Sequence, residues 1–183
     1  MIMAENFLKI IDLFNSTKES RGDIRLNLHE GAMLYRFALQ IKEGNILEIG
    51  RMHGGSTVLL TVATHNTKTR IVSIDLEDSM KTQQFFENYE EKSRVDIRID
   101  NSWKMKNIPI SLLWVDGDHS YDGIKKDFIH HWNYLDGPCL AHDYTCPQCP
   151  GVTTFINEWV EKGYAEILEQ QQTMVALKKI KNY

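Results

Sequence analysis

The clearest sign of fold class in this 183-residue chain lies in Ile110-Ser-Leu-Leu-Trp-Val-Asp-Gly-Asp-His-Ser-Tyr-Asp122. The stretch begins as a short apolar run, typical of a buried β-strand, and ends in carboxylates and one imidazole. Strands that deliver polar groups to their carboxyl ends are typical of open α/β sheets, whose ligands bind at that edge. A second run, Cys139-Leu-Ala-His-Asp-Tyr144, repeats the pattern. We therefore expect the polar residues that end the two runs to converge: Asp116, His119, His142 and Asp143.

Short apolar runs alternate with helical patterns along the rest of the chain. Helices are expected at 1–14, 30–41, 56–63, 79–92, 122–135 and 152–162. Strands are expected at 45–50, 70–75, 95–100, 111–116 and 139–142, and a closing hairpin at 164–170 and 173–181. Helical crossovers between apolar strands predict a mostly parallel sheet that is covered on both faces. The expected fold is α/β, a three-layer Rossmann-like sandwich of about seven strands with a C-terminal antiparallel hairpin.

Composition narrows the class of protein. The chain is 42% hydrophobic and 25% charged, with no repeat or linker, so one domain is expected over 1–183: N-terminal helices at 1–43 and a cofactor-binding core at 44–183. A net charge of -4 without a basic run disfavours a nucleic-acid partner. No apolar run reaches the roughly 20 residues of a membrane span, and three cysteines without an even framework favour a reducing cytoplasm. A small-molecule partner is expected, and the edge of the hairpin leaves a homo-oligomer open.

A glycine-rich turn, Glu48-Ile-Gly-Arg-Met-His-Gly-Gly-Ser-Thr57, follows the first strand and opens a helix. Its glycines let the backbone turn tightly and let a ligand come close. Their spacing fails the G-x-G-x-x-G dinucleotide pattern, and Glu48 would repel a pyrophosphate. Asp75 ends the next strand, where an acid can accept hydrogen bonds from ribose hydroxyls. A ligand with a ribose and a positive charge but no phosphate is S-adenosyl-L-methionine.

In these motifs the chain resembles the class I S-adenosylmethionine-dependent methyltransferases. Within them it is most similar to small O-methyltransferases related to macrocin-type and cephalosporin-hydroxylase-like proteins, and more distantly to catechol O-methyltransferase. The resemblance covers residues 27–159 approximately, and the Asp-Gly-Asp-His-Ser-Tyr motif is fairly specific. It rests on these segments: Glu30–Tyr35, Glu48–Gly50 with Gly54 and Ser56, Ser73–Asp75, Val115–Tyr121 and His142–Tyr144.

The resemblance implies that S-adenosylmethionine lies along the carboxyl ends of the first three strands. Its methionine end would meet the glycine turn, and its carboxylate would bind at a helix N-terminus, where backbone N–H groups favour anions. The implied cofactor residues are Glu48, Gly50, Gly54 and Ser56 around the methionine end, Asp75 at the ribose, and Asp100, Asn101 and Ser102 around the adenine.

The resemblance also implies a catalytic set. In metal-dependent relatives, the positions of Asp116, His142 and Asp143 bind Mg²⁺, and the position of His119 carries the general base in some of them. Asp116 and His119 are therefore the expected catalytic residues. His142 is a departure, because those relatives usually have an acid there, and the softer imidazole suits Mn²⁺, Fe²⁺ or Zn²⁺ better than Mg²⁺. The sequence leaves open whether a divalent metal (Mg, Mn or Fe) assists the reaction.

The expected activity is methylation of a hydroxyl on a small substrate such as a sugar or a natural product. Two alternatives stay open: a non-catalytic nucleoside-binding module and a zinc-bearing interaction domain. The zinc hypothesis rests on a C-x₂-H-x₃-C-x₂-C pattern with the donor types of structural zinc, made by Cys139, His142, Cys146 and Cys149.

The same polar residues also have purely structural explanations. Glu48 could be a loop acid that accepts backbone N–H groups, and Asp75 a helix N-cap. His119 could be a turn residue and His142 a core histidine. Of the tryptophans, Trp114 is expected in the core, as is Trp103 unless it covers the adenine.

Overall fold

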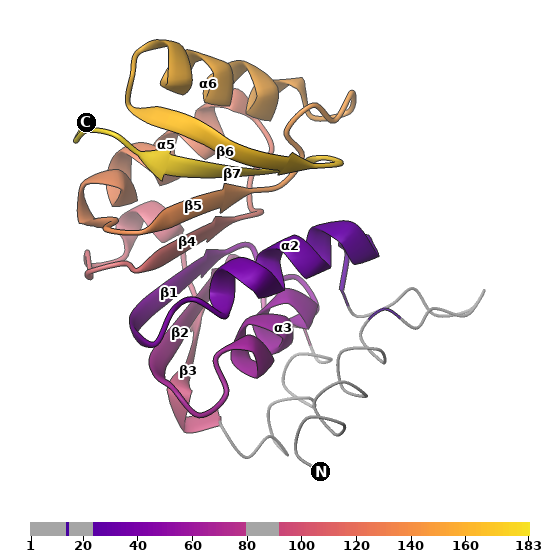
Figure 1. The fold of residues 1–183 in the computed structure, drawn as a ribbon, viewed down its shortest axis with the longest axis vertical. Helices are drawn as coiled ribbons and strands as arrows, with labels where there is room; N and C mark the ends of the chain where they lie inside the picture. Colours follow the sequence, from indigo (N-terminus) through magenta and orange to yellow (C-terminus); the bar gives the residue numbers. More distant parts are fainter. Residues whose placement is uncertain (1–13, 15–23, 80–91) are drawn as a thin grey trace.

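The computed structural model describes Phe14, residues 24–79 and residues 92–183. The helix expected at 1–14 and most of the helix expected at 79–92 lie outside these residues. Within them the chain forms one seven-stranded sheet between helices, as Figure 1 shows.

The elements lie within a few residues of their predicted positions. The strands are β1 (Glu43–Ile49), β2 (Lys68–Asp75), β3 (Val95–Ile99), β4 (Leu112–Val115), β5 (Pro138–Ala141), β6 (Ala165–Gln171) and β7 (Met174–Lys179). The described α-helices are α2 (Leu28–Ala38), α3 (Gly55–Ala63), α5 (Tyr121–His131) and α6 (Pro150–Glu161). Short 3₁₀ turns are η1 (Lys92–Arg94), η2 (Ser102–Lys104) and η3 (Trp132–Tyr134).

The order of the strands creates a crevice at one edge of the sheet. The order is β3-β2-β1-β4-β5-β7-β6. The first five strands pair in parallel, and β7 runs antiparallel to both β5 and β6. The predicted α/β fold with its closing hairpin is confirmed. Because the chain order reverses between β1 and β4, their connections leave in opposite directions, and a crevice opens at the carboxyl ends of these strands.

Alternate strand residues supply two separate cores, one on each face of the sheet. On β1, Ile46 belongs to the core that includes α2 and α3, whereas Leu47 belongs to the core that includes α5 and α6. This alternation follows from the two-residue period of a strand, and burial on both faces explains why the central strands read as continuous apolar runs. Trp114 is fully buried, as expected. No helix within the described residues is long and apolar enough to cross a membrane.

Candidate active site

A cleft of about 920 Å³ lies at the carboxyl ends of β1, β2, β4 and β5. We call its two parts the turn half, with the loop residues that follow β1, β2 and β3 and the side chains that pack against them, and the carboxylate half, with the loop residues that follow β4 and β5 and the side chains that pack against them. The cleft brings Asp75 and Asp116 into one cavity. Its walls include most of the predicted site residues: Gly50, Ser56, Asp75, Asp100, Asn101, Ser102, Asp116, His119, His142 and Asp143.

Glu48 lies beneath the floor of the cleft and does not line it, which corrects the prediction of a wall residue. It is fully buried, and its carboxylate accepts hydrogen bonds from the hydroxyls of Ser56, Thr57 and Ser73. Burial raises the pKa of Glu48. Its side chain leaves β1 on the face covered by α3, and the carboxylate therefore ties α3 to β1 and β2.

Asp75 holds the glycine turn in place. Its Oδ2 accepts hydrogen bonds from the backbone N–H groups of Arg51 at 2.7 Å and Met52 at 2.8 Å. Partial burial acts to raise the pKa of Asp75, but backbone hydrogen bonds outweigh it and the net pKa is lowered. Its Oδ1 also accepts the backbone N–H of Glu77 at 3.3 Å. A carboxylate has about four acceptor positions, so these three hydrogen bonds leave about one for a ligand in the cleft.

Gly50 brings the two halves of the cleft into backbone contact. It has a φ of 89°, and a Cβ placed there would lie 2.1 Å from the carbonyl oxygen of Asp116. Only glycine tolerates both the dihedral angle and the close approach. Gly54, with a φ of 85°, is the N-cap of α3 and does not line the cleft.

Two buried residues of the turn half were not anticipated from the sequence. The Arg51 guanidinium donates to the carbonyl oxygens of Ser73 at 3.0 Å and Arg98 at 3.3 Å. The Ser102 hydroxyl donates to Asp127, whose pKa burial raises to about 6. No local signal marked Arg51 or Asp127, because a charged side chain is buried only when other elements supply its partners.

The segment that the resemblance assigns to the adenine lies in the wall of the turn half. Asp100 and Asn101 line the cleft beside Ser102, and the exposed ring of Trp103 lies in the same wall. Trp103 therefore lies outside the core, where a planar ligand could stack on its ring.

Four titratable side chains converge in the carboxylate half, as the two strand ends predicted. Nδ1 of His142 lies 3.2 Å from Oδ1 of Asp116 and 3.5 Å from Oδ2 of Asp143. Nε2 of His119 lies 3.5 Å from the same oxygen of Asp116 and 3.3 Å from that of Asp143. Asp143 has a φ of 60°, a left-handed conformation that clusters at functional sites.

Glu30, at the start of α2, packs against His142 and is a further member of the carboxylate half that no sequence pattern indicated. Its Oε2 lies 3.3 Å from Nε2 of His142 and accepts the backbone N–H of Asn27 at 3.0 Å. Its Oε1 accepts the hydroxyl of Thr173 at 2.7 Å. The Asn27-x-x-Glu30 spacing is a capping-box signal for the start of α2, but it says nothing of a contact with His142.

Three acids surround the two imidazoles of the carboxylate half and shift the pKa values of both rings. Burial acts to lower the pKa of His142, but hydrogen bonds to Asp116, Asp143 and Glu30 outweigh it and raise the pKa to about 12. The hydrogen bond with His142 lowers the pKa of Asp143 to about 2. The pKa of His119 is also raised, chiefly by Asp116. The three shifts share one cause, because a carboxylate and an imidazole that lie close together each favour the charged form of the other.

The donor atoms of Asp116, His142 and Asp143 fit a divalent cation. One donor from each lies within 4.8 Å of the others. Glu30 stands behind the far nitrogen of His142, as carboxylates commonly do behind metal-bound histidines. The two carboxylates are ligands that Mg²⁺ and Mn²⁺ prefer, and the imidazole shifts the preference toward softer ions.

Comparisons with known proteins identify the family of the chain and solved structures that share its fold. A family model described as a methyltransferase domain matches residues 47–144. A comparison with curated protein sequences finds no match.

Solved structures share the fold at low sequence identity. The O-methyltransferase NovP has a TM-score of 0.77 at 14% identity, covering 98% of this chain and 99% of NovP. The S-adenosylhomocysteine-bound methyltransferase PaMTH1 of Podospora anserina has a TM-score of 0.73 at 17% identity, covering 96% and 88%. The TDP-rhamnose 3'-O-methyltransferase CalS11 has a TM-score of 0.62 at 16% identity, covering 81% and 76%. Since the family model spans more than half of the chain, the protein belongs to the methyltransferase-domain family, and its fold is that of the class I S-adenosylmethionine-dependent methyltransferases.

Proposed function

We propose that the protein transfers the methyl group of S-adenosylmethionine to a hydroxyl oxygen of a small molecule, such as a sugar or a natural product. The proposal rests mainly on one observation. Asp75, the acid expected to bind the ribose, and the carboxylate half face the same cleft. The O-methyltransferases NovP and CalS11, which share the fold, support oxygen as the acceptor atom.

The cofactor would lie along the turn half. Asp75 would accept hydrogen bonds from the ribose, with the adenine between Asn101 and Trp103. The methionine carboxylate would meet the N-terminus of α3 near Ser56, where free backbone N–H groups favour an anion. The sulfonium methyl would then point toward the carboxylate half.

The acceptor hydroxyl would be activated in the carboxylate half. A neutral hydroxyl is a weak nucleophile, so His119 would take its proton as a general base, a contribution of about 10²–10⁴-fold. Asp116 would orient the hydroxyl for in-line attack on the methyl group. A divalent cation held by Asp116, His142 and Asp143 would supply Lewis-acid stabilisation of the acceptor oxygen. Glu30 would fix the orientation of the His142 ring.

Calorimetry with S-adenosylhomocysteine tests the cofactor assignment. We expect binding to the wild type, and about 10–100-fold weaker binding to Asp75→Ala, because the ribose contact and the support of the turn are both lost. Asp96→Ala is a matched control, since this half-exposed aspartate pairs with Arg98 on β3 and lies outside the cleft. Absence of binding to the wild type would refute the proposal.

Transfer from labelled S-adenosylmethionine to a panel of hydroxylated acceptors tests the reaction. Asp116→Asn should lower turnover while leaving S-adenosylhomocysteine affinity within about 3-fold. Removal of divalent ions by a chelator should lower turnover, and added Mg²⁺ or Mn²⁺ should restore it. Tight cofactor binding without transfer to any acceptor would instead favour the non-catalytic nucleoside-binding module.

A further inference from the structure

The segment Cys146-Pro-Gln-Cys149 forms a defined turn between β5 and α6. The N–H of Cys149 donates to the carbonyl oxygen of Cys146 at 3.0 Å, and Cys149 is the N-cap of α6. Thr145 precedes the turn with a φ of 66°, and its N–H donates to the Thr153 hydroxyl at 2.9 Å. The turn therefore has a fixed geometry next to the carboxylate half.

Gly151 lets the first turn of α6 pack directly on the loop that carries His119. A Cβ on Gly151 would lie 2.3 Å from the backbone nitrogen of Tyr121 and 3.0 Å from the carbonyl oxygen of His119. Because the glycine has no side chain, the two backbones touch, and Sγ of Cys149 comes to 3.6 Å from Nδ1 of His119. The proximity of thiol and imidazole is thus built into the packing of α6.

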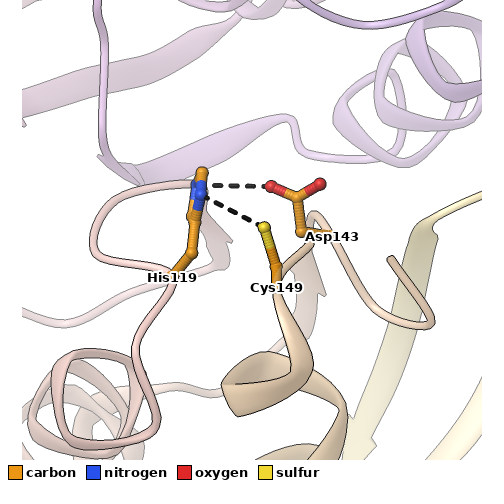
Figure 2. Close-up of side chains that lie close together, drawn as sticks. All are labelled: His119, Asp143 and Cys149. Atoms are coloured by element: carbon orange, nitrogen blue, oxygen red, sulfur yellow. Dashed lines mark hydrogen bonds and ion pairs between the residues drawn. The ribbon is translucent and has the colours of Figure 1, made fainter. Parts of the chain in front are cut away.

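Asp143 completes a group of three different donors. Figure 2 shows the His119 ring facing both the Cys149 thiol and the Asp143 carboxylate. One donor atom from each residue lies within 4.8 Å of the others. Zinc bonds of about 2.3 Å to sulfur and about 2.1 Å to nitrogen, at a tetrahedral angle, separate the two donors by about 3.6 Å. The observed separation of Sγ and Nδ1 matches that value.

We propose that His119, Asp143 and Cys149 form a binding site for a thiolate-preferring divalent cation of the zinc class. Sulfur and imidazole donors select such an ion over Mg²⁺. Three protein ligands leave a fourth position open, as in zinc sites that also hold water or substrate. The site differs from the Asp116, His142 and Asp143 set in its donors and shares only Asp143 with it.

The structure also revises the zinc pattern read from the sequence. Cys139 is fully buried in the core with α5 and α6 and cannot join Cys149 at one ion. His142 is directed to Glu30, Asp116 and Asp143. His119, which that pattern did not include, takes their place.

Occupation of this site would have a consequence for catalysis, which rests on the proposed function. An ion bound to His119 occupies the lone pair that would accept the proton of the acceptor hydroxyl. Zinc-class ions would therefore inhibit methyl transfer.

The experiment uses Co²⁺ as a spectroscopic probe. Reduced, metal-free protein is titrated with Co²⁺ without S-adenosylmethionine, and Zn²⁺ is then added as competitor. Thiolate-bound Co²⁺ has an intense near-ultraviolet charge-transfer absorption that oxygen and nitrogen ligands do not produce. We expect this absorption in the wild type, its displacement by Zn²⁺, and at least about 100-fold weaker Zn²⁺ binding in Cys149→Ser.

Two variants provide matched controls. Cys146→Ser makes the same change in the same turn but outside the three ligands, and Asp122→Asn changes an exposed acid of α5 that is not one of the three donors. Both should keep the absorption, with Zn²⁺ affinity changed by less than about 3-fold. Absence of the absorption in the wild type, or its persistence in Cys149→Ser, would overturn the proposal. Because the readout needs neither cofactor nor turnover, this failure is distinct from a failure of the proposed methyl transfer.

Discussion

The two halves of the cleft satisfy their polar groups in different ways. In the turn half, the buried Glu48 carboxylate receives three hydroxyl hydrogen bonds, and Arg51 donates to backbone carbonyl oxygens. In the carboxylate half, two histidines lie between acids, with partly exposed rings and carboxylates 3.2–3.5 Å apart. The buried Glu48 and the Nη1 atom of Arg51 have hydrogen-bond partners in the turn half, although Nε of Arg51 has none among the described residues, whereas the carboxylate half has more acceptors than donors.

This difference separates structural from chemical roles. Buried groups with complete hydrogen bonding stabilise the fold and are expensive to remove. Partly exposed acids and imidazoles that lie close together contribute less to stability. Their charge state changes when a proton or a cation binds. Substitutions of the buried groups of the turn half that do not line the cleft, such as Glu48, should therefore change the free energy of unfolding, whereas substitutions in the carboxylate half should change turnover.

The largest expected effect is on turnover. His119→Ala should lower kcat by about 10²–10⁴-fold, which is a rise of about 3–5 kcal/mol in the activation barrier, because the proposed general base is lost. The free energy of unfolding should change by less than about 0.5 kcal/mol, since the side chain is exposed. Initial rates and urea denaturation check the two parts, with the exposed His29→Ala as control. A fall in the free energy of unfolding as large as the rise in the activation barrier would contradict the separation of structural from chemical roles.

The next effect is on stability. Glu48→Ala should lower the free energy of unfolding by about 3 kcal/mol, because three buried hydroxyls lose their acceptor and a cavity remains. Glu43→Ala, at the exposed start of the same strand, should change it by less than about 0.5 kcal/mol. Urea denaturation of both variants measures the difference. Equal values would show that Glu48 is not the structural link that its contacts indicate.

A smaller effect concerns pH. The folded-state pKa of Asp127 is about 6, above its usual 3.8, so folding favours the protonated acid. Its stabilising contribution is fully present below pH 3.8 and is lost as the pH rises through 6. Asp127→Asn removes this titration, and the stability of the variant relative to wild type should rise by on the order of 2 kcal/mol between pH 4 and pH 7.

Denaturation curves across that pH range test the sign as well as the size. The exposed Asp122→Asn on the same helix is the control and should show no comparable rise. A relative stability of Asp127→Asn that falls with increasing pH would contradict the assignment of a buried, protonated acid.

The smallest effect is expected at Asp118, next to the proposed base. Its Oδ1 accepts the backbone N–H of Ser120 at 2.9 Å in an exposed turn. Asp118→Ala should cost about 0.5 kcal/mol and change turnover by less than about 3-fold, while Asp118→Asn keeps the acceptor. A large loss of turnover in Asp118→Ala would show that Asp118 takes part in the reaction together with the other acids of the carboxylate half.

The sequence was most informative where local pattern and position coincide. Asp75, Asp116 and Asp143 each follow a short apolar run, and the ends of parallel strands share one edge of a sheet. Their meeting in one cleft followed from that rule.

Glu48 was expected to line the cleft but is buried under α3. The two-residue period of a strand gives the face on which a side chain lies, but not whether that face meets solvent or a helix.

Contacts between distant segments account for what the sequence did not reveal. Glu30 reaches His142 because α2 begins beside the carboxyl end of β5. This position depends on the packing of α2 against the sheet that contains β5. Cys149 reaches His119 because Gly151 allows two backbones to touch. Local propensity and hydrophobic period were enough to set the elements, their order along the chain and the polar strand ends, since each depends on near neighbours. The pairing of charges across the cleft was determined by packing, since it depends on which distant segments the folded sheet brings together.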